Sequence, residues 1–351
     1  MIGRYKNANL PKHHIIDLNY NKLAKKTFIS IKTIEKVEEH LKRGDQILFF
    51  INRRGFAPYV FCKKCLNVFS CPNCSINLVY HKNKKQLLCH YCGYTSNLHR
   101  KCKKDYICDF VFSGPGVEKI AEEVKILFPN QKTTIFSSDT MNKASGKNIL
   151  NKIIIGEINI LVGTQLISKG FHFPNLNCII VLDIDLTSQG HDLRSAEKNL
   201  QLYHQLSGRA GRAGKSANVY FQTFSSKTET IEQITNEDPF KFLDHELELR
   251  KKNNLPPYER FVSLILSSED EKKLDQESLK LKKIISNSIN EKILGPVNAP
   301  IFKINRKFRS RFLIRAKKTS KIQKKIKIIL KKIKIPPGMK LIVDVDPISF
   351  N

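Results

Sequence analysis

The cysteines of this chain are clustered, and the cluster constrains the fold more than any other feature of the sequence. Of the nine cysteines, eight lie between residues 62 and 108: Cys62, Cys65, Cys71, Cys74, Cys89, Cys92, Cys102 and Cys108. Three Cys-x-x-Cys pairs come first, and this spacing lets both thiolates of a tight turn face one metal ion. Because two pairs complete a tetrahedral site, eight ligands predict two zinc ions rather than disulfides.

The last pair of the cluster is irregular. A regular pair beginning at Cys102 would have its second ligand at Asp105, whereas the next thiol is Cys108. Zinc accepts carboxylate oxygen as well as sulfur, so either residue could complete that site, and loss of its metal is a third alternative. Nearby histidines lack paired spacing, and we expect them to be surface residues rather than ligands; they are His81, His90 and His99.

The net charge of the chain is +29, from 61 Lys and Arg against 32 Asp and Glu. Such an excess attracts polyanions, and nucleic acid is the first candidate partner. An A/T-rich genome offers a second explanation, because its codons enrich Lys, Asn and Ile without selection for binding. No apolar run approaches the ~18 residues of a membrane span, and the opening MIGRYKNANL has no apolar signal core. We therefore expect a cytoplasmic protein with no membrane partner.

Strands and helices alternate on both sides of the cysteines. Helices are expected at 31–43, 117–128, 142–153 and 195–207, and strands at 47–51, 133–137, 158–162, 178–184 and 217–224. This alternation predicts an α/β domain whose parallel sheet is covered on both faces. The cysteine segment is then an insertion between the first strand and the rest of that domain.

A second unit follows Leu255-Pro256-Pro257. Its expected elements are strand 261–267, helix 271–290, strands 293–304 and 309–316, helix 319–333 and strand 340–345. The order βαββαβ is typical of a ferredoxin-like α+β domain. We therefore divide the chain into the start of the α/β domain (1–61), a zinc-binding insertion (62–110), the remainder of the α/β domain (111–254) and a C-terminal domain (255–351).

The most specific motif is Gln205-Leu-Ser-Gly208-Arg209-Ala-Gly-Arg212, at the end of an expected helix. By composition alone it would be a basic loop. Its spacing, however, resembles the sixth motif of superfamily 2 helicases, in which arginines neutralise the charge that develops on a nucleotide γ-phosphate. We therefore favour a nucleotide-facing role for Arg209 and Arg212.

A second motif follows the expected strand 158–162. It begins Gly163-Thr164-Gln165 and continues to Lys169-Gly170, and alone it would be an ordinary strand-to-helix turn. Its place before the arginine motif makes it similar to the fifth helicase motif. In those enzymes the Gly-Thr pair contacts the DNA backbone, and the Lys-Gly pair lies near the nucleotide.

The printed sequence contains no P-loop. Residues 208–216 (GRAGRAGKS) end like one, but Arg209 occupies the position of its first glycine, and an expected helix precedes the loop instead of a strand. No Asp-Glu-x-His or Asp-Glu-x-Asp box follows an apolar strand. We therefore expect ATP and Mg²⁺ to bind only jointly with a first lobe that carries these elements, and we do not expect this chain alone to hydrolyse ATP.

Taken together, several segments resemble the bacterial replication restart helicases of the PriA (primosomal protein N′) family. They are NRRGFAP at 52–58, the cysteine array, GVEK at 116–119, GTQLISKGFHFPN at 163–175, DLRSAE at 192–197, QLSGRAGRAGK at 205–215, LPP at 255–257, LGPV at 294–297 and VDVDP at 343–347. The resemblance runs over essentially the whole chain and covers only the carboxyl-terminal half of the family. It implies a RecA-like second helicase lobe with a double zinc insertion.

The resemblance also implies an activity and partners. The family unwinds DNA in the 3′→5′ direction at abandoned replication forks, so the implied partners are DNA, an N-terminal helicase half, single-strand-binding protein and primosome proteins. The implied catalytic residues are Arg209, Arg212 and Gln205, and the implied nucleotide contacts are Gly208, Lys169 and Gly170. The implied DNA contacts are Gly163, Thr164, Gln165, Arg53 and Arg54. One zinc would be held by Cys62, Cys65, Cys102 and either Asp105 or Cys108, and the other by Cys71, Cys74, Cys89 and Cys92.

Two other hypotheses remain open. One is a non-catalytic module that binds single-stranded DNA through zinc knuckles and a basic segment in which Phe302, Phe308 and Phe312 alternate with Lys and Arg. Its simpler counterpart is a strand pair whose aromatic side chains face the core. The other hypothesis is a decaying gene remnant, which would also explain the missing cysteine at position 105.

Overall fold

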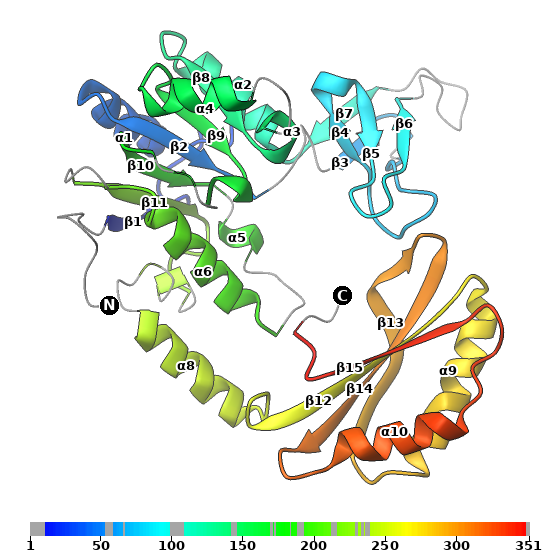
Figure 1. Cartoon of the computed structure of the whole chain (residues 1–351). Helices are drawn as coiled ribbons and strands as arrows, with labels where there is room; N and C mark the ends of the chain where they lie inside the picture. Colours follow the sequence, from blue (N-terminus) through cyan, green and yellow to red (C-terminus); the bar gives the residue numbers. More distant parts are fainter. Residues whose placement is uncertain are drawn as a thin grey trace.

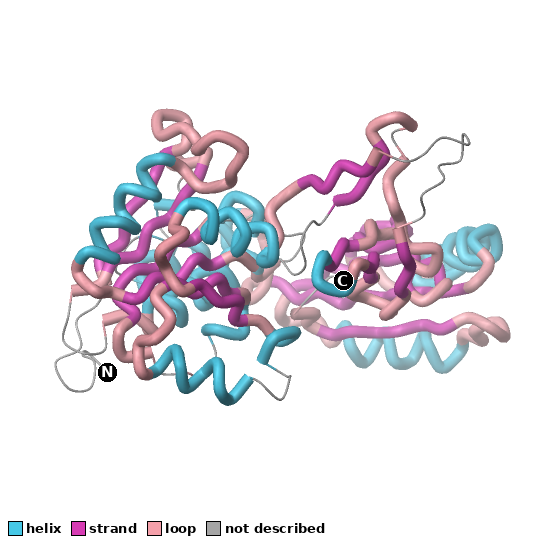
Figure 2. Tube along the Cα trace, turned by 90° about the horizontal axis from the view of Figure 1, so that it is seen from above, coloured by secondary structure: helices cyan, strands magenta, loops and turns pink. Residues whose placement is uncertain are grey.

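The computed structural model describes residues 11–348 apart from short internal ranges, which are 53–58, 66, 99–108, 142–145, 169–170, 172, 183, 188–192, 212–215, 229–230, 233–234 and 236–238. Three bodies are visible: a sheet domain, a cysteine subdomain inserted into it, and a C-terminal domain (Figure 1). Seen from above, the C-terminal domain lies beside the sheet domain (Figure 2). Within the described ranges, none of the helices has the length and apolar character that a membrane crossing requires.

In the described part of the sheet domain, six parallel strands run in the order β1-β11-β10-β2-β9-β8. They are β1 (Lys12–Asp17), β2 (Gln46–Phe50), β8 (Thr133–Phe136), β9 (Ile160–Gly163), β10 (Leu176–Val181) and β11 (Asn218–Thr223). The central strands β10, β2 and β9 are buried along their whole length. This burial is typical of a parallel sheet covered on both faces, so the expected α/β fold class is confirmed.

Successive side chains of a strand point to opposite faces of the sheet, and helices cover both of these faces. Phe49 faces a core that α1 (Ile31–Lys42) and α2 (Val117–Leu127) complete. Phe50 faces the other core, which receives α4 (Gly146–Ile154), α6 (Ser195–Ser207) and α8 (Pro239–Lys252). Shorter elements are α3 (Ser138–Met141), η2 (Gln165–Ser168) and α5 (Ile184–Thr187).

The sheet domain differs from the sequence expectation at both of its ends. Strand β1 precedes β2 and pairs with β11, so the expectation that the cysteines follow the first strand is wrong. The sequence does not predict α8, because large apolar side chains such as Phe240 and Leu243 are exposed on it beside the buried Phe242. The helix expected at 142–153 begins at Gly146 as α4 in the described residues.

The cysteine subdomain lies between β2 and α2 in the chain. Strands β3 (Tyr59–Cys62) and β7 (Phe110–Ser113) form an antiparallel pair. A second antiparallel sheet contains β4 (Val79–His81), β5 (Gln86–Leu88) and β6 (Thr95–Asn97), with η1 (Lys82–Lys84) after β4. Its apolar core is small and includes three of the cysteines themselves. Subdomains with so little core usually depend on a metal for stability.

The C-terminal domain has the expected ferredoxin-like arrangement. Its elements are β12 (Glu259–Ser268), α9 (Glu271–Ser286), β13 (Lys292–Ile304), β14 (Lys307–Lys317), α10 (Ile322–Lys332) and β15 (Lys340–Val345). The strand order β13-β14-β12-β15 is that of two interleaved βαβ units, and every pairing is antiparallel. Both helices pack on one face of this sheet, where Phe312 and Leu264 are fully buried.

Candidate zinc centre and nucleotide-facing edge

Four cysteines of the subdomain converge on one point. The sulfur atoms of Cys71, Cys74, Cys89 and Cys92 all lie within 4.8 Å of one another, and the Sγ atoms of Cys71 and Cys92 are 3.6 Å apart. A tetrahedral zinc with Zn–S bonds of about 2.3 Å separates its sulfur ligands by about 3.8 Å. The geometry therefore fits one zinc ion, and it brings together the four cysteines that the sequence analysis assigned to one site.

Two similar turns hold these sulfurs. The Cys71 amide N–H donates to the Ile76 carbonyl at 2.9 Å, and the Cys89 amide N–H donates to the Tyr94 carbonyl at 2.8 Å. In the second turn Gly93 has φ +75°, a conformation in which a Cβ would be strained. Each Cys-x-x-Cys segment is therefore closed by backbone hydrogen bonds that aim both thiols inward.

Burial and hydrogen bonds shift the pKa values of the Cys71, Cys74 and Cys92 thiols. Burial raises the pKa of the Cys71 thiol to about 12, and burial raises the pKa of Cys74 as well. Burial opposes ionisation of Cys92 too, but hydrogen bonds from the Tyr94 N–H and from Cys89 outweigh it and lower the pKa of Cys92 to about 7. A divalent metal would compensate the charge of four thiolates held this close together.

The other predicted zinc site is described only in part. The Cys65 backbone N–H bonds to the Cys62 sulfur and lowers the pKa of that thiol to about 6, which favours the thiolate a metal needs. The other ligands expected at this site, which are Cys102 and either Asp105 or Cys108, lie outside the described residues. The choice between Asp105 and Cys108 therefore stays a prediction.

The expectation that the histidines lie on the surface is wrong for His81, whose exposed fraction is 3%. Its Nε2 atom lies 3.2 Å from Nε2 of His90, and its Nδ1 atom lies 3.6 Å from a carboxylate oxygen of Glu118 on α2. His90 itself is exposed, and His99 lies outside the described residues. The sequence gives no signal for the burial of His81 because its cover comes from a distant helix.

The two helicase-like motifs meet at the carboxyl ends of the strands. Gly163 ends β9, and Thr164 follows it as a buried residue whose N–H donates to the Phe136 carbonyl at 3.3 Å. Arg209, just after α6, donates from Nη1 to the carbonyl of Phe171 at 2.9 Å. Phe171 belongs to the loop that continues from Gly163, so the structure joins the two segments directly.

The remaining predicted residues of these motifs are only partly placed. Gln205 is exposed on α6, Gly208 caps that helix, and Gln165 is exposed on η2. Five residues lie outside the described ranges: Arg53, Arg54, Lys169, Gly170 and Arg212. Gly163 is tightly enclosed, because an added Cβ would lie 3.2 Å from Ile167 Cδ1.

Sequence reasoning missed one structural residue that contacts the start of α6. Arg250 on α8 is buried and donates to Glu197 Oε1 at 2.6 Å, near the start of α6, and to Glu246 Oε1 at 3.0 Å. It also donates to the Leu193 carbonyl at 3.1 Å. The only sequence signal is DLRSAE, which contains Glu197, and nothing local connects it with Arg250 more than fifty positions away.

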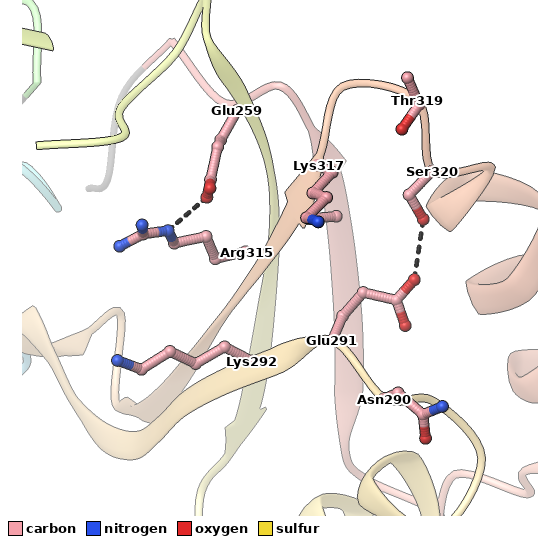
Figure 3. A pocket seen from close by; sticks show the side chains of 9 residues that line it. Glu259, Asn290, Glu291, Lys292, Arg315, Lys317, Thr319 and Ser320 are labelled. Atoms are coloured by element: carbon pink, nitrogen blue, oxygen red, sulfur yellow. Dashed lines mark hydrogen bonds and ion pairs between the residues drawn. The ribbon is translucent and has the colours of Figure 1, made fainter. Parts of the chain in front are cut away.

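A pocket of about 480 Å³ lies in the C-terminal domain, and we do not assign it as the functional site (Figure 3). Its two carboxylates already have cationic partners, because Glu259 pairs with Arg315 and Glu291 pairs with Lys325 at 2.7 Å. Ser320 also donates to Glu291 at 2.8 Å. These bonds outweigh burial and lower the pKa of Glu291, so both carboxylates of the pocket are already engaged with cations.

Comparison with known protein families agrees with this architecture. Residues 71–96, which contain the four converging cysteines, match the model of the PriA DNA helicase Cys-rich region. Residues 251–348 match the Primosomal protein N C-terminal domain. These two domains, joined by a parallel α/β domain with helicase-like motifs, define the class of primosomal replication proteins.

Curated relatives match the whole chain. It is 40% identical to the replication restart protein PriA of Rickettsia felis, over 100% of this chain and 54% of that protein. It is 31% identical to the proteins of the same name from Bacillus subtilis and Haemophilus influenzae, over 92% and 97% of this chain. The chain belongs to the PriA family and corresponds to the carboxyl-terminal half of its members, spanning about half the length of the Rickettsia relatives.

Solved structures of helicases show only a distant likeness. A yeast DEAD-box splicing factor, Prp28, is 13% identical with a TM-score of 0.34, over 71% of this chain and 38% of that one. The Hef helicase domain of Pyrococcus furiosus is 15% identical with a TM-score of 0.26, over 55% of this chain and 24% of that one.

Proposed function

We propose that this chain forms the second motor lobe, the zinc subdomain and the C-terminal domain of a 3′→5′ ATP-dependent DNA helicase that acts at stalled replication forks. The observation that carries the proposal is the bond from Arg209 to the loop that follows Gly163 and Thr164. In a motor, the residues that contact the nucleotide must be coupled to those that contact DNA. The bond from Arg209 to this loop would provide that coupling directly. The family relationship supplies the substrate class.

In this mechanism Arg209 and Arg212 stabilise the charge that develops on the γ-phosphate during hydrolysis. A lobe with a P-loop and a magnesium-binding acidic box, on the same or a separate polypeptide, holds ATP and Mg²⁺. Gln205 assists catalysis beside the arginines, and Gly208, Lys169 and Gly170 contact the nucleotide in this proposal. Gly163, Thr164 and Gln165, with Arg53 and Arg54, hold the DNA strand.

Two zinc ions stabilise the cysteine subdomain in this proposal. Cys71, Cys74, Cys89 and Cys92 hold one, and Cys62, Cys65, Cys102 and Asp105 or Cys108 hold the other. Single-strand-binding protein and primosome proteins are the expected protein partners, by family relationship. In this proposal zinc takes no part in ATP hydrolysis, and it stabilises the fold of the cysteine subdomain.

The motor proposal is tested by measuring DNA-stimulated ATPase of this chain together with a polypeptide that carries a PriA first lobe. We expect forked DNA to stimulate hydrolysis and Arg209→Ala to lower the rate by about 10³-fold or more, as for other arginine fingers. Arg43→Ala, at an exposed arginine after α1, is the matched control and should keep the rate. Hydrolysis that is indifferent to Arg209 would contradict the assignment.

A second candidate function, binding of single-stranded DNA without catalysis, is favoured by one basic aromatic cluster. The Phe302 and Phe308 rings are 5.3 Å apart and half-buried, and Lys303 Nζ lies 4.9 Å from the Phe308 ring centre. Burial lowers the pKa of Arg309 and Arg311 on the same strand, so their partly desolvated charges would favour a phosphate. Phe312 is buried in the core, as expected if the aromatic side chains of this strand pair face the core.

Salt dependence separates the two functions. Under the binding-module hypothesis, the isolated chain binds single-stranded DNA with an affinity that falls steeply with salt and does not respond to nucleotide. Under the motor proposal, ATP changes the DNA affinity once the first lobe is present. Binding without any nucleotide response in the presence of that lobe would favour the module.

A further inference from the structure

The tip of the β13–β14 hairpin touches the first cysteine turn of the zinc cluster. The Ser75 N–H donates to the Lys303 carbonyl at 2.9 Å, and the Arg306 N–H donates to the Asn73 carbonyl at 2.8 Å. The Arg306 guanidinium also bonds Asn73 Oδ1 at 3.1 Å. In Figure 1 the hairpin extends from the C-terminal domain to the cysteine subdomain, so these bonds join two domains.

The contact reaches the metal ligands themselves. The backbone N–H of Asn305 donates to the sulfur of Cys74. Ile304, beside it, packs against the apolar cluster that contains the cysteines. A metal-bound thiolate is a stronger acceptor than a thiol, because charge-assisted hydrogen bonds are about twice as strong as neutral ones. The bond from the hairpin tip to Cys74 should therefore be stronger when the cluster holds a metal.

The turn conformation indicates that the contact fixes the hairpin. Asn305 and Arg306 have φ +50° and +67°, and they lie between the paired residues Ile304 and Lys307. Two consecutive positive φ values define the tight hairpin turn in which Asn-Gly and Asp-Gly are preferred. Arginine at the glycine position is unfavourable by itself, so its bonds to Asn73 offset a local cost.

The opposite side of the subdomain is anchored to the sheet domain. The Lys82 N–H donates to Glu118 Oε2 at 2.9 Å, and Lys82 Nζ pairs with Glu122 Oε1 at 2.7 Å. Both glutamates are on α2. The cysteine subdomain thus lies between α2 and the hairpin, and a change in its shape acts on both contacts.

We propose that zinc in the Cys71–Cys74–Cys89–Cys92 cluster fastens the C-terminal domain to the cysteine subdomain, and that the hairpin tip in turn strengthens zinc binding. Bound zinc holds the turn at residues 71–75 in the shape that Lys303, Asn305 and Arg306 recognise. Loss of zinc frees the turn, and the hairpin tip then loses the bonds that hold it to the cysteine subdomain. The two effects are reciprocal by thermodynamic linkage.

The test uses the full chain and a variant whose hairpin still folds. N305D/R306G places Asp-Gly, a favourable turn pair, at the tip, while it removes the guanidinium bond to Asn73 and sets a carboxylate beside Cys74. Zinc affinity is measured by competition with a chromogenic chelator. We expect a loss of about 10-fold or more, the usual effect of removing groups that support metal ligands. Lys318→Asp, an exposed site in the same domain with the same change in charge, should leave affinity unchanged.

The reciprocal effect is measured by hydrogen exchange of the zinc-loaded and the chelator-treated chain. Removal of zinc should speed exchange at residues 302–308 as well as at 71–76, and leave α9 protected as an internal reference. The proposal is overturned if the hairpin exchanges equally with and without zinc. It is also overturned if N305D/R306G binds zinc as tightly as the unaltered chain.

Discussion

Replacing Arg250 with methionine should destabilise the sheet domain by breaking the junction between α8 and α6. The guanidinium, in a residue that is only 7% exposed, bonds Glu197, Glu246 and the Leu193 carbonyl at 2.6, 3.0 and 3.1 Å. Methionine keeps the aliphatic packing but leaves both carboxylates without this cation. Removing one partner of a buried ion pair costs about 3–5 kcal/mol.

The structure places the expected loss at the lower end of that range. The Glu197 and Glu246 side chains are 16% and 19% exposed, so water relieves part of the cost. Glu197 also keeps Arg194, whose Nε is 2.8 Å from Oε2. We therefore expect about 3 kcal/mol, which in a domain of this size lowers the melting temperature by about 6–12 °C.

Differential scanning calorimetry of the full chain measures this shift in the transition of the sheet domain. Arg43→Met, at an exposed arginine, is the control and should change stability by no more than about 0.5 kcal/mol. Equal transitions for the two variants would refute the reasoning, because the junction would then contribute nothing beyond a surface residue.

Three further predictions follow from single residues. Cys89→Ser should reduce the zinc measured by atomic absorption by one ion per chain, and an unchanged content would contradict the four-cysteine site. Gly163→Ala should destabilise by about 1 kcal/mol in urea unfolding, since Ile167 Cδ1, Leu48 Cδ1 and the Phe136 carbonyl lie 3.2–3.4 Å from the new Cβ. Burial, and the nearby charge of His13, lower the pKa of His204, so stability should fall as pH drops below about 6.5; His204→Phe should remove that fall in thermal unfolding measured between pH 7 and 5.

Local patterns in the sequence were sufficient for most of the fold. The helix expected at 195–207 has those bounds as α6, and the six elements of the C-terminal domain occur in the expected order. Both patterns are carried by apolar residues at regular spacing within one segment. The four converging cysteines were predictable for the same reason, because their pairing depends on a spacing of two residues.

Features that depend on distant partners could not be predicted. Strand β1 (KHHIID) has little apolar pattern and is fixed by pairing with β11, two hundred residues later. His81 is buried by contact with α2, and Arg250 finds its partners on α6. In each case the stabilising interaction joins segments that are far apart in the sequence. Local periodicity does not relate such segments, so the interaction becomes visible only in the folded structure.

The contacts of Arg250 and of the hairpin tip constrain the C-terminal domain at two separate points. Arg250 Nη1 donates to the Pro256 carbonyl at 3.3 Å, so α8 holds the start of the connection into β12. At the other point, the turn after β13 is held at Asn73 by the Arg306 N–H. A domain held at one point can rotate about it, whereas two separated points leave little freedom. Loss of either contact should therefore release motion without separating the domains. Arg250 also bonds the start of α6, whose other end leads to Arg209. The attachment of the C-terminal domain and the arginine that we propose to face the nucleotide therefore share one helix.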